Sequence, residues 1–413
     1  MSSPTQTPSQ FRSTLAPLRI PSFRNLLVSN ALWWQARWME MLVVGWLVLE
    51  LTDSAWQVAL VGFYRSIPLL IVGFIAGPLA SRLGRFRLIL LSQGASQVVI
   101  FILTALLWTD QIALWHLQAS AVIFGISWSF NWTSRRALVP DIVGKDQTVE
   151  AMLLESFTSN ISRVLGPLLG GVLIDILGAP GGYTAVAIIS AISLCCMFLV
   201  RPPASPTASS SNASPWTLMV EGLRYMRRNQ TILGALLITV VMNFFIFPYQ
   251  ILLPVFARDV LSQGPVGLGW LGAANGIGAF VGLYLVNRLR GVFSRGWIFG
   301  IGSAFQSLML LAFSFSDVFP ASIALLVFSG FGHACFGVMQ SAIVLLSAED
   351  HMRDRAMGTL VLAIGTGPLG QLQIGALAEA YGAPFALHIH AAASVLLVLL
   401  IIALLPEFRK RLD

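Results

Sequence analysis

The sequence predicts an all-α integral membrane protein with twelve transmembrane helices in two pseudo-symmetric six-helix bundles. Of its 413 residues, 56% are hydrophobic and only 10% are charged, whereas about a quarter of the residues of a soluble chain are charged. Apolar windows of about 20 residues, the length that crosses a bilayer, recur along the whole chain. The positive charges fall in alternate turns between these windows, which favours an even number of crossings.

Each apolar window is bounded by a short polar or Gly/Pro-containing turn, so each is expected to form one helix that satisfies its backbone polar groups internally. The first six windows are Leu26–Leu49, Trp56–Ala80, Leu88–Leu107, Ile112–Phe130, Ala151–Leu173 and Tyr183–Val200. The second six are Ile232–Phe256, Leu268–Val286, Trp297–Phe315, Phe319–Val344, Met357–Ala378 and Phe385–Leu404.

The distribution of positive charge predicts the orientation. All but four of the 25 lysines and arginines lie in one set of alternate turns and tails; Arg258 lies in the other set, and three arginines lie within windows. Because Lys and Arg are retained on the cytoplasmic side during insertion, both termini and the central segment are predicted to be cytoplasmic. The expected location is the plasma membrane, which is the inner membrane in a Gram-negative cell.

The segment at 202–215, PPASPTASSSNASP, has the Pro/Ser composition of a linker that cannot bury a core. Residues 216–228 follow with apolar and basic side chains at helical spacing, which predicts an interfacial helix. The predicted organisation is a cytoplasmic tail at 1–22, a bundle at 23–200, a linker with the interfacial helix at 201–230, a bundle at 231–405 and a cytoplasmic tail at 406–413.

Composition and motifs argue against several function classes. The net charge of +7 would suit nucleic acid, but the basic residues are scattered between apolar windows rather than clustered on one polar surface, so no nucleic-acid partner is expected. No metal or cofactor is expected, because His388 and His390 project from different helix faces. The chain has no His-Glu-x-x-His cluster and no phosphate-binding loop, so it is not expected to be an enzyme.

The two halves repeat one another at an offset of about 200 residues, as expected of parallel repeats. Gly166-Pro-Leu-Leu-Gly170 in the fifth window corresponds to Gly367-Pro-Leu-Gly370 in the eleventh. The segment Gly77-Pro-Leu-Ala-Ser-Arg-Leu-Gly-Arg-Phe-Arg87 resembles the cytoplasmic signature of the major facilitator superfamily. The segments at 135–141, 163–171 and 253–258 resemble the branch that contains enterobactin exporters and macrolide-type efflux proteins. The resemblance implies secondary active transport by alternating access.

The resemblance also implies a cytoplasmic gate, formed by Gly77, Ser81, Arg82, Gly84, Arg85, Arg135 and Arg136. Ser81 stands where the family signature usually has an aspartate, and a hydroxyl cannot form the ion pair of that latch. Either Asp141 or Glu155 substitutes for it, or the lost contact is non-essential. The fifth-window motif of Gly166, Pro167, Gly170 and Gly171 resembles one of exporters in this superfamily and predicts a helix that bends, with ordinary close packing as the alternative.

Ionisable residues within the windows are costly and face a cavity or a partner. Arg37 and Glu40 are three residues apart, so they can meet on one helix face. Glu40 is a candidate proton carrier, with a permanent Arg37–Glu40 pair as the alternative, and Glu155 is the second candidate. The cavity is predicted to include Arg37, Trp38, Arg65, Asn160, Asn243, Tyr249 and Asn275.

Three arginines against two carboxylates within the windows favour an anionic or neutral substrate. The sequence thus predicts a proton-coupled exporter, an antiporter, of a small siderophore-like or drug-like organic molecule. An uptake permease or a lysolipid translocator on the same fold is the alternative, and a non-transporting membrane sensor is a further one. The expected partners are the substrate, protons and the lipid bilayer, and the expected state is a monomer.

Overall fold

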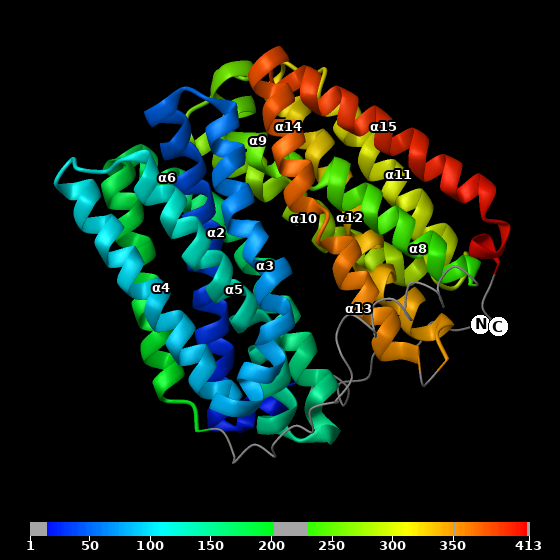
Figure 1. Cartoon of the computed structure of the whole chain (residues 1–413), viewed down its shortest axis with the longest axis horizontal. Coiled ribbons are helices and arrows are strands. Elements are labelled where there is room, and N and C mark those ends of the chain that lie inside the picture. Colours follow the sequence, from blue (N-terminus) through cyan, green and yellow to red (C-terminus); the bar gives the residue numbers. More distant parts are fainter. Residues whose placement is uncertain (1–14, 202–228, 350–351, 411–413) are drawn as a thin grey trace.

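The computed structural model describes residues 15–201, 229–349 and 352–410, and within these ranges the chain forms helices joined by short turns (Figure 1). The first group of helices comprises α2 (Pro21–Thr52), α3 (Ala55–Leu83), α4 (Arg85–Trp108), α5 (Leu114–Val143) and α6 (Thr148–Phe198). The second group comprises α8 (Gln230–Val241), α9 (Tyr249–Val255), α10 (Pro265–Leu289), α11 (Arg295–Phe313), α12 (Phe319–Ser347), α13 (Arg353–Ile364), α14 (Gly367–Tyr381) and α15 (Ala383–Leu404).

The expected helical membrane fold is confirmed at this level. Within the described ranges, eight helices are long and apolar enough to cross a membrane. Helices α2, α3 and α5 are not among these eight. Helices α2 and α5 are richer in charged, polar and tryptophan residues, and these residues build the site described below.

Helix α6 combines two of the predicted crossings. A straight helix of its 51 residues would be about 75 Å long, more than twice the thickness of a hydrocarbon core. Gly178 interrupts it with a φ of 69°, a left-handed conformation that glycine adopts without strain. The chain reverses there, and the second arm returns along α4, where Trp108 Nε1 donates to Thr184 Oγ1 at 2.9 Å and Gln97 Nε2 donates to the Ala187 carbonyl at 3.2 Å.

Two predicted windows of the second half are locally distorted. The chain from 230 to 260 stays helical, but it passes through π-helical turns at Met242–Ile246 and Phe256–Val260. Pro248 and Pro254 lack an N–H donor in this segment, which disfavours regular helix around them. In the eleventh window, α13 ends and α14 begins around Gly365, shortly before Pro368.

The two ends of the molecule can be told apart from α2. At its start, Ser22 Oγ donates to the Arg201 carbonyl at 3.1 Å and Asn25 Nδ2 donates to the Leu199 carbonyl at 3.2 Å. The linker leaves from this end, which we call the linker end. Helix α2 finishes at the opposite end, beside Asp53, which we call the distal end.

Hydrogen bonds join the two groups at the distal end. Arg258 of the second group pairs with Asp53 and also donates to the Leu49 carbonyl at 3.2 Å. Glu379 Oε2 accepts hydrogen bonds from Ser54 Oγ and from the Trp56 backbone N–H, both at 3.0 Å. In Figure 1 the two groups lie side by side where α3 meets α14 and diverge towards the bottom of the view.

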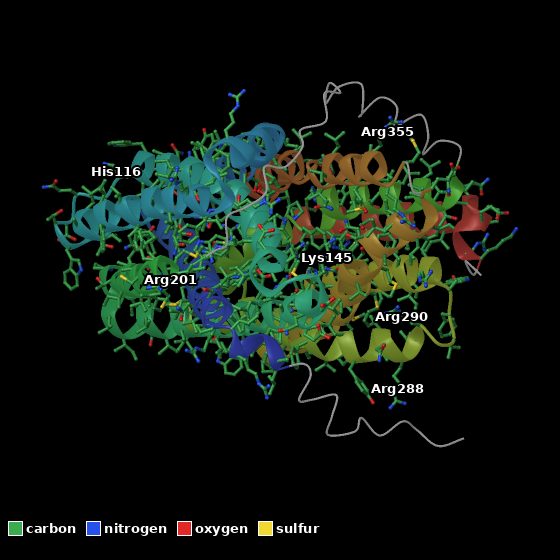
Figure 2. All side chains as sticks on the ribbon, turned by 90° about the horizontal axis from the view of Figure 1, so that it is seen from below. His116, Lys145, Arg201, Arg288, Arg290 and Arg355 are labelled. Carbon is green, nitrogen blue, oxygen red and sulfur yellow. The ribbon has the colours of Figure 1, made fainter. Side chains whose placement is uncertain are left out.

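The basic turns occur in both groups. Figure 2, seen from below, labels Lys145 and Arg201 in the first group and Arg288 and Arg290 in the second. The predicted interfacial helix at 216–228, and most of the predicted N-terminal tail, lie outside the described residues. The predicted domain boundaries and orientation therefore stay predictions.

Candidate functional site

Five tryptophans from α2 and α5 form a cluster inside the first group, which we call the tryptophan cluster. Trp33 stacks on Trp128 with ring centroids 5.6 Å apart, and Trp34 stacks on Trp38 at 6.5 Å. Trp128 contacts Trp132 at 5.0 Å. The four-residue spacing of 34 to 38 and of 128 to 132 places each pair on one helix face. Of these five side chains only Trp38 was expected in the site, although the spacing of the others is visible in the sequence.

Arginine side chains lie over the rings of this cluster. The guanidinium carbon lies 3.7 to 5.4 Å from the ring centroid in the pairs Arg37 over Trp128, Arg136 over Trp132, Arg135 over Trp33 and Arg163 over Trp38. A guanidinium within about 6 Å of an indole centroid is attracted to its face. The cluster is therefore an aromatic surface with cations attached.

A cavity of about 330 Å³ opens on one side of the tryptophan cluster, and we call it the open cavity. Its walls include the indoles of Trp33, Trp34 and Trp132, together with Arg136 and Glu155. Its volume falls within the range of about 300 to 1,000 Å³ that is typical of small-molecule sites. The walls offer planar apolar faces together with charge of both signs.

Arg135 and Glu155, both predicted functional residues, have different surroundings. Arg135 is buried; it pairs with Asn30 Oδ1, donates to Gln93 Oε1 at 2.7 Å and to Asn131 Oδ1 at 3.0 Å. This network holds α2, α4 and α5 together. Glu155 accepts a hydrogen bond from Asn30 Nδ2 at 3.3 Å and faces the open cavity. Of these two side chains, Glu155 makes fewer hydrogen bonds and is therefore the more available for proton exchange with the open cavity.

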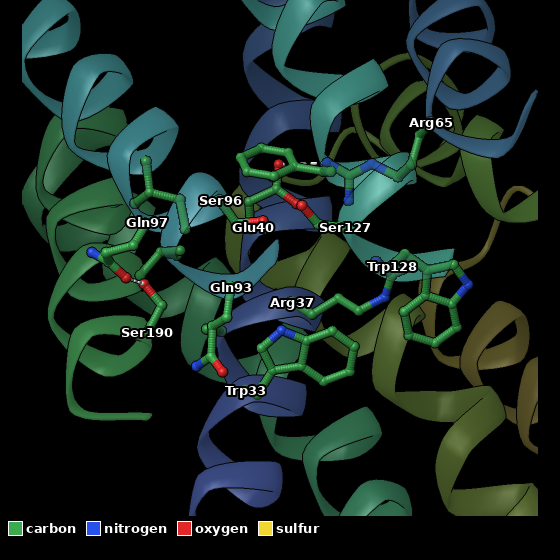
Figure 3. Close-up of a pocket in the computed structure, with 14 residues that line it drawn as sticks. Trp33, Arg37, Glu40, Arg65, Gln93, Ser96, Gln97, Ser127, Trp128 and Ser190 are labelled. Carbon is green, nitrogen blue, oxygen red and sulfur yellow. Dashed lines mark hydrogen bonds and ion pairs between the residues drawn. The ribbon is translucent and has the colours of Figure 1, made fainter. Parts of the chain in front are cut away.

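The expected Arg37–Glu40 pair is replaced by another. Arg65 Nη2 donates to Glu40 Oε1 at 2.5 Å, and the two side chains are only 9% and 6% exposed. Arg37 instead extends from α2 towards Trp128 (Figure 3). Arg65 reaches Glu40 from α3. Because its guanidinium already neutralises the Glu40 carboxylate, Arg37 on the same helix as Glu40 is not required as the ion-pair partner.

Three predicted cavity residues meet where the groups touch at mid-depth. Trp38, Tyr249 and Asn275 line a cavity of about 80 Å³ between α2, α6, α9 and α10. Arg163 crosses this junction, because its Nη1 lies 2.8 Å from His333 Nε2 and its Nη2 donates to Asn275 Oδ1 at 3.2 Å. The buried Trp38 Nε1 has no hydrogen-bond partner among the described residues, so it is a donor available to a ligand.

Two other predicted cavity residues bond to their own helices. Asn243 Nδ2 donates to the Thr239 carbonyl at 2.9 Å, and Asn160 Nδ2 donates to the Ser156 carbonyl at 2.8 Å. Neither residue lines the cavities described here. Asparagine competes in this way for carbonyls one turn earlier in a helix.

Five of the seven predicted gate residues lie around the short turn between α3 and α4, and the other two, Arg135 and Arg136, belong to α5. Gly77 and Ser81 belong to α3, Arg82 is exposed, and Gly84 forms the turn with a φ of 83°. Arg85 Nη1 donates to Asp141 Oδ2 at 2.6 Å and to the Ala137 carbonyl at 3.2 Å. Asp141 thus forms an ion pair at this end, with Arg85 rather than with Arg135 or Arg136.

The glycine motif of α6 lies against helices of both groups. A Cβ at Gly166 would collide with Trp38 of α2, and one at Gly171 would collide with the Pro265 carbonyl of α10. The backbone at Pro167 stays helical, since Gly178 is where α6 departs from helical geometry. The motif permits close approach on two sides, and the predicted bend at Pro167 stays a prediction.

Comparisons with known proteins agree with this architecture. The family model of the transmembrane secretion effectors matches residues 12–411. The chain is 25% identical to the multidrug efflux pump Tap of Mycolicibacterium fortuitum, over 82% of this chain and 84% of the relative. It is 23% identical to the staphyloferrin A transporter of Staphylococcus aureus, over 86% and 89%, and 23% identical to the enterobactin exporter EntS of Salmonella choleraesuis, over 87% and 86%.

Solved structures share the fold. A bacterial homologue of the human lysosomal transporter Spinster, in an inward-facing and unoccupied conformation, superimposes with a TM-score of 0.73 at 14% identity, covering 96% of this chain and 100% of that one. The nucleoside transporter NupG gives 0.73 at 14% identity, covering 92% and 98%. These relatives and structures are membrane transporters rather than enzymes. The chain therefore belongs to the transmembrane secretion effector family of the major facilitator superfamily, and it is a multi-pass membrane transporter.

Proposed function

We propose that this protein is a proton-coupled exporter of a small organic molecule and that it works by alternating access. The observation that carries the proposal is the open cavity, whose volume of about 330 Å³ and tryptophan walls suit a drug-sized ligand. The efflux pump and siderophore transporters among its relatives point to the same class of cargo.

The proposed architecture is twelve spans in two bundles of six, at 23–200 and 231–405. The reversal at Gly178 divides α6 into two spans, so the first group supplies six. The second group supplies six if 230–260 and 353–381 each count as one span. In this arrangement the tails at 1–22 and 406–413 and the linker at 201–230 are cytoplasmic, so the linker end faces the cell interior in an inner membrane.

The contacts between the groups support an inward-facing state. Asp53 with Arg258, and Ser54 with Glu379, close the distal end, while the groups diverge towards the linker end (Figure 1). Export requires these contacts to open and the linker end to close around the cargo. The Arg85–Asp141 pair and the α3–α4 turn belong to the proposed cytoplasmic gate, and the glycine motif is the proposed surface on which α6 and α10 slide.

Glu155 is the better of the two candidate proton carriers. Glu40 is held in a buried ion pair with Arg65, whereas Glu155 lies on the wall of the open cavity. A carboxylate at the substrate site can couple proton uptake to substrate release directly. Arg37, Trp38, Arg65, Tyr249 and Asn275 remain the proposed substrate contacts.

The charge of the cavity walls supports an anionic or neutral substrate. Arg37, Arg65, Arg135 and Arg163 line the cavities of the first group and its junction with the second, against Glu40 and Glu155. Anions are favoured in such a surplus of guanidinium groups. A negative-inside potential would also drive each negative charge outward, by about 2.3 kcal/mol per 100 mV.

Everted membrane vesicles test the proposal. Vesicles that contain the protein and carry an imposed proton gradient are offered a siderophore, a macrolide and a lysolipid, and uptake into the vesicles is measured. We expect gradient-dependent uptake of one organic cargo, which corresponds to export from the cell. Glu155→Gln should abolish the gradient dependence, while Asp175→Asn, an exposed carboxylate on the same helix, should not. Accumulation only in right-side-out vesicles would identify a permease, and lysolipid as the sole cargo would identify a lipid translocator.

A further inference from the structure

A second cavity lies inside the first group, lined by residues of α2 to α6, and we call it the small cavity (Figure 3). It has a volume of about 50 Å³. Arg37, Glu40 and Arg65 line it, together with the indoles of Trp33 and Trp128. The small cavity thus contains two guanidinium groups, one carboxylate and two aromatic faces.

Some hydrogen-bond donors of the small cavity have no partner. Arg65 Nη2 is bound to Glu40 Oε1, but Arg65 Nη1 is buried and has no hydrogen-bond partner in the described part of the chain. The Arg37 guanidinium lies over the Trp128 ring at 3.7 Å and has no hydrogen bond within the described residues. One carboxylate offsets one of the two cations, so the small cavity carries an excess of one positive charge. A charge in such a cavity without a counter-ion is unfavourable, and a single anion would relieve it.

The size and charge of the small cavity select the kind of anion. A water-sized probe occupies about 10 to 15 Å³, so 50 Å³ holds about four such probes, and a carboxylate group has three heavy atoms. A carboxylate carries the single negative charge that matches the excess, whereas a phosphate monoester carries about −1.5 to −2. A carboxylate is also planar and fits the fork of a guanidinium.

Trp33 lies between this site and the open cavity, because it lines both. A cargo that reaches past Trp33 can place a small head group in one cavity and a larger body in the other. The small cavity cannot hold a drug-sized molecule, whereas the open cavity, at about 330 Å³, has room for the body.

We propose that the cargo is an organic acid whose carboxylate binds between Arg37 and Arg65 while its body lies against the tryptophans of the open cavity. This inference rests on the proposed transport function and specifies its substrate class. Arg37 and Arg65 hold the head group, and Trp128 keeps the Arg37 guanidinium in place by stacking against it. Glu40 keeps Arg65 in position by occupying its other amino group.

Benzoate and benzamide are the probes, since they share a planar shape and differ in charge. Binding to the purified full-length protein in lipid nanodiscs is measured by saturation-transfer NMR. We expect benzoate to bind at least tenfold more tightly than benzamide. Arg37→Gln should remove this preference and Arg37→Lys should keep part of it, because a lysine retains the charge but loses the fork. Arg288→Gln, which removes an exposed arginine beside Tyr284, should leave the preference unchanged.

Arg37 is the position to vary, because removing Arg65 would leave the buried Glu40 carboxylate without its ion-pair partner. If Arg37→Gln does not fold, Trp128→Leu removes the ring on which the Arg37 guanidinium lies and should weaken benzoate binding. The proposal is overturned if benzoate does not bind, if benzamide binds equally well, or if a folded Arg37→Gln protein keeps the wild-type preference. Vesicle transport of a neutral cargo together with any of these results would reject the acid site alone. Benzoate binding without flux of any cargo would reject the transport function instead.

Discussion

The buried ion pair between Glu40 and Arg65 makes a quantitative prediction. Both side chains are at least nine-tenths buried, and their atoms approach to 2.5 Å. Removing one partner of such a pair leaves the other charge buried and typically costs about 3–5 kcal/mol. We therefore expect Glu40→Gln and Arg65→Gln each to lower the free energy of unfolding by about this amount. The double variant should lose much less than the sum of the two single variants.

The assay is a double-mutant cycle in mixed micelles, with unfolding induced by sodium dodecyl sulfate and followed by circular dichroism. A coupling energy of about 2–3 kcal/mol is expected for Glu40 with Arg65, near the upper end for residues in contact. The parallel cycle of Glu40 with Arg37 should give less than about 0.5 kcal/mol. Glu155→Gln is the control, since Glu155 has no ion pair among the described residues. Additive effects of Glu40→Gln and Arg65→Gln would refute the pairing, and a large coupling with Arg37 would restore the arrangement expected from sequence spacing.

Two further predictions concern the helix contacts and the proposed gate. Gly171→Ala should reduce transport strongly, because the new Cβ would collide with the Pro265 carbonyl. Gly94→Ala is the control: its Cβ meets nothing within 4 Å, so it should leave transport intact and stabilise α4 by about 0.4–1 kcal/mol. Equal activity of the two variants in vesicles would contradict the role of the α6–α10 contact. Asp141→Asn should remove the ion pair with Arg85 and lower the free energy of unfolding by no more than about 1 kcal/mol, because both side chains are partly exposed. A much larger decrease in the same unfolding assay would mean that the pair supports the fold rather than a gate.

The helices could be predicted from the sequence, because a helix that crosses a bilayer needs about 20 consecutive apolar residues and such a window is visible in the local composition. Even the reversal within α6 was expected, since Gly178 lies between the windows ending at Leu173 and starting at Tyr183. The segment at 77–87, together with the repeated Gly-Pro motif, indicated the superfamily. These features are encoded within short stretches of chain.

The site was harder to predict because its partners come from different helices. The spacing of Arg37 and Glu40 shows that they can meet, but Arg65 reaches Glu40 from α3, and no local pattern encodes that approach. Asn160 and Asn243 were predicted to line the cavity, yet each bonds to a carbonyl one turn earlier in its own helix. The tryptophan cluster was not predicted, although the sequence contains a signal for it: the four-residue spacing of Trp34 with Trp38 and of Trp128 with Trp132 places each pair on one helix face.

Crosslinking of the distal end tests the alternating-access proposal most directly. Ser54 and Glu379 are joined by a hydrogen bond in the closed distal end, so Ser54→Cys with Glu379→Cys, in a chain whose three native cysteines are replaced, can be bridged by a short reducible crosslinker. We predict that crosslinked protein in proteoliposomes stops transporting and that reduction restores transport, while the single Ser54→Cys variant is unaffected by the reagent. Undiminished transport by fully crosslinked protein would contradict the account, because the cargo would then leave without opening the distal end.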